Sequence, residues 1–420
     1  MPSRRKPSDN LFFDGLRTAA GNLPAGLLRL GPPADPAAIA AAESALGQPL
    51  PHSYVEFLRS FNGADLFHES LMVCGVGAGA ALDLVTANEI PHETDGHKEE
   101  LVVAESATGD LFTIELEAPE THDEPRVFRV RPDADERWLA GSSFPRWLEA
   151  TIAHHALIYD ADGEFLSEAF EPEGEELVPT FALRQAERAL RKDPGSALYQ
   201  HERGLALRRL GRLPNAREAF GQAAAADPTN PWPWFDLGRC DQELGRHAEA
   251  AAAFECAAEA ASGPEGARFS AWAARSFHLA GERQTAERLR LAALERAPGL
   301  VEQLKAAALA AREEGDDEAA DEADALVDLL GQGIPLSRKL PVLARASAPP
   351  PPATARPQLG SKPAKSPPPR TNGLTRGKPN LGKPGLAKGS SKSSAPVAPQ
   401  KINKLAKASK TKGAGRAPRR

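Results

Sequence analysis

The chain has 420 residues, 26% of them charged, and a formal net charge of −6. That value hides two opposite parts, because residues 331–420 hold 20 Lys and Arg and no acid, which leaves about −26 on residues 1–330. Three scattered cysteines exclude a disulfide framework or zinc knuckle, and no apolar run is long enough to span a membrane. We expect two or three domains in a cytoplasmic protein without a signal peptide, and the many Ala, Arg, Gly and Pro residues favour a bacterial one.

Two short helices are predicted near the start of the first domain, which we place at residues 10–160. Asp35-Pro36 supplies an N-cap and a proline at the first helical position, and Gly47 ends this helix. Pro51 starts the second helix, and Asn62-Gly63 ends it. Its apolar face consists of Tyr54, Phe57, Leu58 and Phe61. A face of this kind must cover an apolar surface.

The sequence of the following hundred residues predicts a sheet, which would supply the apolar surface that the helices cover. The expected strands are residues 71–74, 101–106, 111–117 and 126–130. Residues 107–110 read as a hairpin turn between the middle two strands. A closing helix runs from Phe144 to Ile152, with its apolar residues on one side. The order of elements predicts an α+β domain in which the helices gather against one sheet.

These motifs resemble the SUKH superfamily, which includes the yeast Smi/Knr cell-wall regulators and many bacterial immunity proteins. The resemblance rests on Gly47-Gln48-Pro49-Leu50-Pro51, the aromatic helix, Asn62-Gly63 and the closing Ser143-Phe144-Pro145-Arg146-Trp147-Leu148. The chain departs from the pattern at Ala64, where the family often has a second glycine. The resemblance implies a non-enzymatic binding module. Partners vary widely within the family, so the resemblance does not identify the partner.

An acidic linker, residues 161–178, precedes a repeat region at residues 179–332. Gly204, Ala216 and Phe220 recur 34 residues later as Gly238, Ala250 and Phe254, which is the tetratricopeptide period. Trp234-Phe235-Asp236-Leu237-Gly238 resembles the W-x-x-L-G signature of that repeat. We predict a leading helix at 179–193, three units at 197–230, 231–264 and 267–300, and a degenerate capping pair at 301–330. Three stacked units are enough for a stable all-α solenoid.

The first helix of each unit is expected to line the inner groove of the solenoid. The candidate peptide-binding residues are His201, Leu205, Arg208, Arg209, Trp232, Phe235, Arg239, Arg268, Arg275 and His278. Aromatic rings would supply contact area and arginines would supply charge, so the hypothesis is a peptide with apolar and acidic side chains. The alternative is that the arginines are solvated and paired with neighbouring acids of the chain itself.

Residues 333–420 form a tail rich in Pro, Lys, Ser and Ala. Such a composition buries too little apolar surface to fold, and we expect disorder. A basic arm without acids can contact nucleic acid phosphates weakly and without specificity. It can equally contact the acidic part of its own chain or an anionic membrane surface. The absence of aromatic residues argues against base stacking.

Four motifs imitate chemical sites. Residues 75–80 satisfy G-x-G-x-x-A, but no parallel βαβ unit follows, which favours a strand-to-helix connection. The loop His92–His97 lacks the spacing of a zinc site, and adjacent His154-His155 point to different faces. Residues 160–171 resemble a calcium loop, yet Phe165 stands where that loop needs glycine, so a polar turn is favoured. We expect no catalytic, metal or cofactor site.

The leading hypothesis is a non-enzymatic adaptor or scaffold that binds protein partners through the SUKH-like surface and the repeat groove. One version is an immunity-type protein that neutralises a toxin. The alternative is a regulatory factor that associates with nucleic acid or an anionic envelope surface through its basic tail. The sequence identifies neither the partner nor the packing of the two folded parts.

Overall fold

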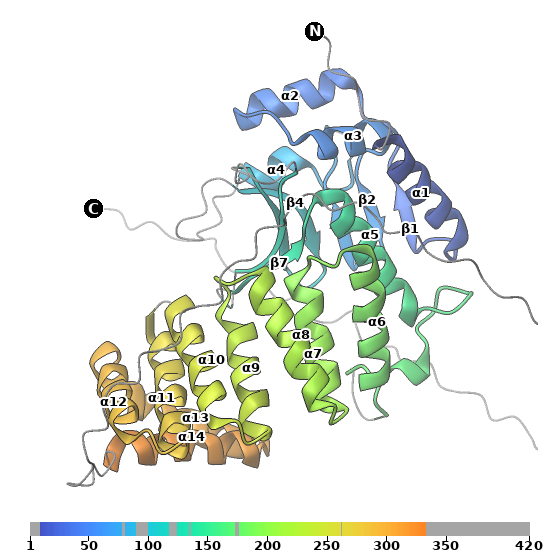
Figure 1. Ribbon diagram of the computed structural model, residues 1–420. Helices are drawn as coiled ribbons and strands as arrows, with labels where there is room; N and C mark the ends of the chain where they lie inside the picture. The colour runs from blue at the N-terminus through green and yellow to red at the C-terminus, as the bar shows by residue number, and fades with distance from the viewer. Residues whose placement is uncertain are drawn as a thin grey trace, which may run out of the picture. The chain divides into compact units, whose positions relative to one another are not determined.

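The computed structural model describes residues 9–77, 80–89, 100–116, 124–132, 134, 136–172, 176–261 and 263–332. By its contacts the chain divides into Met1–Leu343 and Ala344–Arg420. The first unit contains both the predicted α+β domain and the repeats (Figure 1). The predicted disordered tail and the His92–His97 loop lie outside the described residues.

The first part of the chain forms a seven-stranded antiparallel sheet in which neighbours along the chain are neighbours in the sheet. The strands are β1 (Leu28–Leu30), β2 (Ala64–Leu66), β3 (Leu71–Val73), β4 (Glu100–Ser106), β5 (Leu111–Glu115), β6 (Val127–Arg131) and β7 (Glu136–Gly141). The helices are α1 (Asp9–Asn22), α2 (Pro36–Leu46), α3 (His52–Ser60), α4 (Leu84–Glu89) and α5 (Phe144–His155). The α+β prediction is therefore confirmed, although α1, β1, β2, α4 and β7 were not anticipated.

Local signals in the sequence account for the helix pair α2 and α3. The Asp35 carboxylate accepts a hydrogen bond from the Ala37 amide at 2.9 Å, which caps α2. Gly47 ends α2 in the left-handed conformation with φ 72°. Tyr54 and Phe57 are fully buried against the ring of Phe144, with centroid distances of 5.0 and 5.3 Å. The aromatic face of α3 therefore belongs to the core between the helices and the sheet.

The glycine run that imitates a dinucleotide fingerprint has a packing role at its start. A Cβ atom on Gly75 would lie 2.6 Å from the backbone oxygen of Asn62, so a side chain does not fit there. The Asn62 amide group donates to the Val76 carbonyl at 2.9 Å and accepts from the Val76 amide at 2.7 Å. Asn62-Gly63 therefore joins the end of the α3 segment to the strand-to-helix connection that follows β3.

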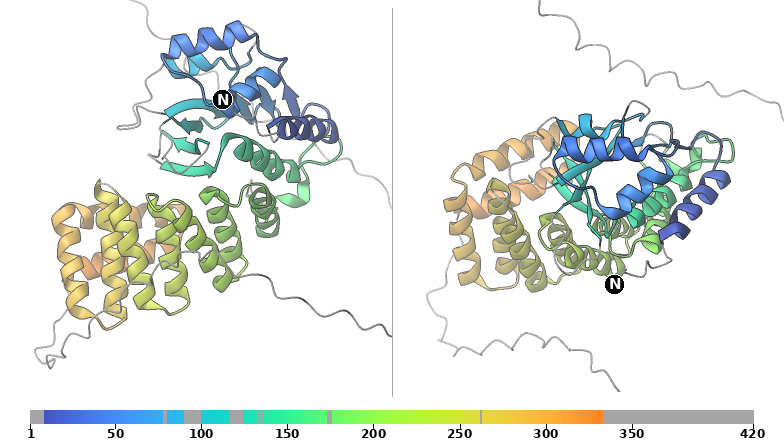
Figure 2. Two further views of the ribbon diagram at one scale, coloured as in Figure 1. Left: turned by 45° about the horizontal axis from the view of Figure 1, so that its top comes forward. Right: turned by 90° about the horizontal axis from the view of Figure 1, so that it is seen from above.

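The second part of the chain is a row of antiparallel helices. After the short turns η1 (Ala156–Ile158) and η2 (Ser167–Ala169) come α6 (Pro179–Lys192), α7 (Ala197–Arg209), α8 (Leu213–Ala226), α9 (Pro231–Glu243), α10 (His247–Ala260), α11 (Gly263–Leu279), α12 (Arg283–Arg296), α13 (Leu300–Glu314) and α14 (Asp317–Gln332). Figure 2 shows α7 to α12 side by side in one row. The helix pairs follow the predicted 34-residue units.

The period has a direct packing cause. A Cβ atom on Gly204 would lie 2.4 Å from the ring of Phe220, and one on Gly238 would lie 2.7 Å from the ring of Phe254. Both rings are fully buried. In these two units the first helix therefore needs glycine at this position, because the phenylalanine of the second helix fills the space where a side chain would stand.

Candidate functional site

An open groove of about 690 Å³ lies beside the first helix pair of the array. Leu205, Arg208 and Arg209 of α7 line it, together with residues of α6 such as Ala182 and Gln185. Leu205 is 37% exposed and lies about one helical turn before Arg208 and Arg209. We call this cavity the repeat groove. The structure thus brings three of the predicted site residues into one cavity.

Both arginines of the repeat groove are held by acids of the same chain. Arg208 donates to Glu243 at 2.6 Å. Arg209 lies 3.3 Å from Glu176 and 3.4 Å from Glu171, and it also donates to the Leu177 carbonyl at 3.1 Å. These contacts are partly exposed, so each ion pair contributes at most about 1 kcal/mol. An acidic partner can replace such carboxylates at low cost.

The remaining predicted cations lie farther along the inner face, which is formed by α7, α9 and α11. Arg239 contacts Glu322 of α14 at 2.7 Å, and Arg268 lies 3.8 Å from Glu265. The Arg275 guanidinium lies 5.6 Å from the centre of the Trp272 ring. His278 has a buried Nδ1 atom without a hydrogen-bond partner in the described part of the chain. Four of the five predicted arginines therefore have an acidic partner within the chain.

Two predicted groove residues, His201 and Phe235, are largely buried in the structure. His201 is 8% exposed; its Nε2 lies 2.7 Å from Asp236 and its ring lies 4.5 Å from that of Trp138 in β7. Phe235 is 9% exposed and packs among other rings, including Phe269 at 5.1 Å. Sequence position alone did not reveal that the sheet and the aromatic cluster cover these side chains.

Trp232 is partly buried and packs against the apolar cores of both the sheet and the repeats. Its ring lies 5.7 Å from that of Phe269, nearly perpendicular to it. It therefore serves as contact area between parts of the chain itself.

The edge strand β7 is covered by the repeats, a feature that the motifs did not predict. Figure 1 shows α7 and α8 directly beside β7. Asp193, which is fully buried, accepts hydrogen bonds from the Ser142 amide at 2.7 Å and the Ser142 hydroxyl at 2.8 Å. Asp227, 34 residues later, accepts from the Leu139 amide at 3.4 Å. The repeat period thus supplies two carboxylates to the edge of the sheet, and the Asp-Pro dipeptides 34 residues apart were the available signal.

Helix α5 provides a second set of contacts between the first part of the chain and the repeats. His154 lies 3.0 Å from Glu202 of α7, and Thr151 shares a hydrogen bond of 3.1 Å with the Tyr199 hydroxyl. His155 stacks on Phe67 at 5.4 Å, and its ring also meets that of His154 edge to face at 5.0 Å. The two histidines therefore have different partners on the neighbouring elements but contact each other. Burial, reinforced by the neighbouring His154, lowers the pKa of His155 from 6.5 to about 3.

Acid should destabilise the chain through His155. The unfolded chain takes up a proton at this residue below pH 6.5, whereas the folded chain does not until about pH 3, so stability falls as the pH falls through that window. Because the ring is not fully covered, we expect a loss of about 1–2 kcal/mol between pH 7 and pH 5. Urea denaturation at both pH values measures this loss, and the loss should be smaller in His155→Phe than in the unaltered chain. The exposed His52 provides the control, and an equal shrinkage in His52→Gln would contradict the assignment.

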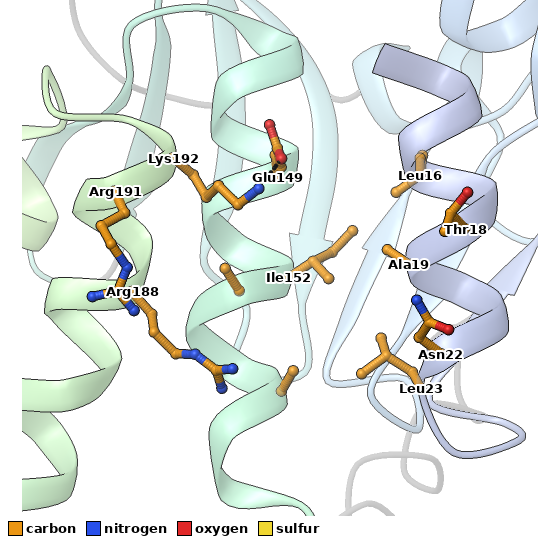
Figure 3. A pocket seen from close by; sticks show the side chains of 12 residues that line it. Leu16, Thr18, Ala19, Asn22, Leu23, Glu149, Ile152, Arg188, Arg191 and Lys192 are labelled. Carbon is orange, nitrogen blue, oxygen red and sulfur yellow. Dashed lines mark hydrogen bonds and ion pairs between the residues drawn. The ribbon is translucent and has the colours of Figure 1, made fainter. Parts of the chain in front are cut away.

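A second cavity, of about 570 Å³, lies between α1, α5 and α6. Figure 3 shows Leu16 of α1, and Leu23 directly after that helix, turned toward Ile152 of α5, with the cationic side chains on α6. Those cations are Arg188, Arg191 and Lys192, and Lys192 pairs with Glu149. The cavity can receive an apolar group that carries a negative charge. No sequence motif indicated it, because α1 itself was not predicted.

Within the residues that the structure describes, no cluster of three or more His, Cys, Asp or Glu side chains could hold a metal ion. The Asp160 carboxylate accepts from the amides of Asp162 and Glu164, and Tyr159 pairs with Phe165 across this turn. The polar turn predicted in place of a calcium loop is thus confirmed. Among the described helices, none combines the length and hydropathy that crossing a membrane requires.

An antiparallel meander covered by helices, joined to stacked helix pairs, defines an α+β domain combined with a helical repeat scaffold. Residues 33–150 match the SMI1 / KNR4 family (SUKH-1), and residues 207–273 match the tetratricopeptide repeat. The chain therefore carries a SUKH-1 domain followed by tetratricopeptide repeats, as its motifs predicted. The comparison with curated proteins gave no match.

Several solved structures are similar to 37% of the chain. MamA 41-end from Desulfovibrio magneticus RS-1 is 18% identical, with 86% of its chain covered and a TM-score of 0.27. YrrB, described as a TPR protein with an unusual peptide-binding site, is 18% identical, with 78% covered and a TM-score of 0.27. Pseudomonas aeruginosa pilF is 18% identical, with 70% covered and a TM-score of 0.26. Similarity at this level transfers no binding property to the chain.

Proposed function

We propose that the protein is a non-enzymatic adaptor that binds an acidic, partly apolar peptide of a protein partner in the repeat groove. Tetratricopeptide repeats are protein-interaction scaffolds, and this supports a binding role for the second part of the chain. The observation that carries the proposal is an open cavity lined by the exposed Leu205 and, one helical turn further on, by Arg208 and Arg209. An apolar side chain of the partner would cover Leu205, and carboxylates would pair with the two arginines.

The SUKH-1 domain would present the second binding surface of the adaptor. Its contacts through Asp193 and Asp227, which follow α6 and α8, join it to the helical array that carries the repeat groove. A partner held in the groove would therefore lie at a defined position relative to a partner of the SUKH-1 surface. An immunity-type role, in which that surface neutralises a toxin, is one form of this proposal, and a regulatory role is the other.

Selection from a displayed random peptide library against the full chain tests the groove. We expect selected peptides to be rich in Asp and Glu with interspersed apolar residues, and to bind Arg208→Glu/Arg209→Glu at least about tenfold more weakly. The matched control is Arg212→Glu/Arg246→Glu, which reverses two exposed arginines at helix starts. Peptides that bind both variants equally well would refute the proposal.

A chain that ends at Gln332 separates the groove from the alternative of tail-mediated binding to nucleic acid or an anionic envelope surface. The adaptor proposal expects the same selected peptides and unchanged affinities. Loss of peptide binding on removal of residues 333–420 would transfer the function to the tail.

A further inference from the structure

Helix α14 lies on the inner face of the repeats. Figure 1 shows α13 and α14 crosswise to α9–α11, and Figure 2 shows the same orange helices against the row of repeats. Ala320, Ala323, Leu326 and Leu330 of α14 are buried. The two leucines belong to the same apolar cluster as Phe269 and Trp272 of α11. The face that a repeat array offers to partners is therefore partly occupied by the chain itself.

The acids of α14 face the predicted groove arginines. Glu322 lies 2.7 Å from Arg239, and Glu318 lies 3.9 Å from it. The Arg239 and Glu322 side chains are 19% and 25% exposed, so their contact is much less accessible to water than a surface ion pair. Burial raises the pKa of Glu322. Three arginines act against that rise: Arg239, Arg208 and Arg275. Glu318 also lines the repeat groove.

The spacing of the α14 residues that contact the inner face indicates which kind of helix this face binds. Glu318, Glu322, Leu326 and Leu330 follow one another at intervals of four, which aligns them along one side of a helix. The acidic half meets the arginines, and the leucine half enters the apolar cluster. Arg290 of α12 donates to the Leu330 carbonyl at 2.7 Å and holds the far end. The inner face thus already binds an acidic amphipathic helix, within the same chain.

We propose that α14 is a displaceable occupant of the inner face, and that the partner is an acidic amphipathic helix with the same four-residue spacing. This inference rests on the proposed function and names its ligand class. Displacement of α14 would join the repeat groove to the surface around Arg239 and Arg275 in one continuous site. Gly315, with φ 82°, ends α13 just before α14 and provides the turn about which α14 would move.

Occupation by α14 has a quantitative consequence for any partner. A partner binds only the fraction of molecules in which α14 has left the inner face, so its apparent affinity is reduced by that fraction. Weakening the contacts of α14 must therefore strengthen the binding of a competing helix. Replacing an arginine that contacts both α14 and the competing helix must not strengthen that binding.

The probe is a fluorescein-labelled synthetic peptide with the sequence of residues 317–332, and its binding to the full-length chain is measured by fluorescence anisotropy. We expect Glu318→Arg/Glu322→Arg in the chain to bind the peptide at least about tenfold more tightly than the unaltered chain does. Adding Arg239→Glu to that variant should remove the gain. The control Glu313→Arg/Glu314→Arg, which reverses two exposed acids of α13, should bind as the unaltered chain does.

Hydrogen exchange of the α14 amides in the same variants makes every outcome decisive. Faster exchange in α14 together with tighter peptide binding supports the inference. Faster exchange without tighter binding overturns it, because the vacated face then does not accept such a helix. Unchanged exchange also overturns it, whatever the affinity, because α14 is then a fixed part of the fold. In both failures, library peptides that still depend on Arg208 and Arg209 would leave the proposed function intact.

Discussion

Replacing Trp147 by alanine should lower the free energy of unfolding of the SUKH-1 domain by about 3–5 kcal/mol. Trp147 of α5 is fully buried, and its ring lies 5.1 Å from that of Phe112 in β5. The site has little freedom to collapse around a cavity, because Gly141 already packs so closely that a Cβ atom there would lie 2.4 Å from the Cβ of Trp147. The lost contacts would therefore not be recovered.

Urea denaturation measures this effect, and Trp234→Ala is the matched control. The Trp234 ring is only partly buried, and its indole N–H donates to the Pro228 carbonyl at 3.2 Å. Its loss should cost about 1–2 kcal/mol. A loss at Trp147 no larger than that at Trp234 would contradict the packing described for α5.

The double variant Asp193→Ala/Asp227→Ala should destabilise the contact between the sheet and the repeats by about 2–4 kcal/mol. Both carboxylates are buried, so their removal leaves the amides of Leu139 and Ser142 without acceptors and away from water. The amides of β7 should then exchange hydrogen faster, while those of β4 and β5 in the middle of the sheet remain protected.

Asp321→Ala, at an exposed position of α14, controls for the loss of a negative charge. It should leave exchange in β7 unchanged. If β7 remained as protected in the double variant as in the unaltered chain, the two carboxylates would not hold the repeats to the sheet.

Much of the fold could be predicted because its signals are local. Caps such as Asp35 and Gly47 act within one helix turn, and the 34-residue period reflects a glycine-to-phenylalanine contact inside each of the first two units. Such features depend on residues close in sequence, so the α2–α3 pair and the helices of the repeats matched their predicted positions.

Strand β7 could not be found in the same way. An edge strand with one exposed side shows alternating polarity, but Trp138, Leu139 and Ala140 are all buried. Leu139 shares an apolar cluster with Ala197 of α7, because the repeats cover the side that would otherwise face water. Strands β1 and β2 have three residues each, which is too few for a periodic pattern.

Predicting the candidate site had a similar limit. Helix position alone correctly placed Leu205, Arg208 and Arg209 together. It could not show that Trp138 covers His201, or that Glu322, 83 residues after Arg239, reaches that arginine. Contacts over such distances in sequence arise from packing between elements. The role of the ten predicted residues in binding a peptide stays a prediction.

The contacts at β7 also determine at which end of the array a repeat unit can be added or lost without disturbing the sheet. Asp193 and Asp227 tie the helices up to residue 227 to the sheet, and the Asn230 amide adds a bond of 2.9 Å to the Arg137 carbonyl. One period further on, the corresponding residue is Ala261, which cannot continue the series. Duplication or loss of a whole unit within 197–230 would therefore disturb the sheet. The same event beyond residue 264 would leave these contacts to the sheet in place, so only that end of the array can change in length without disturbing them.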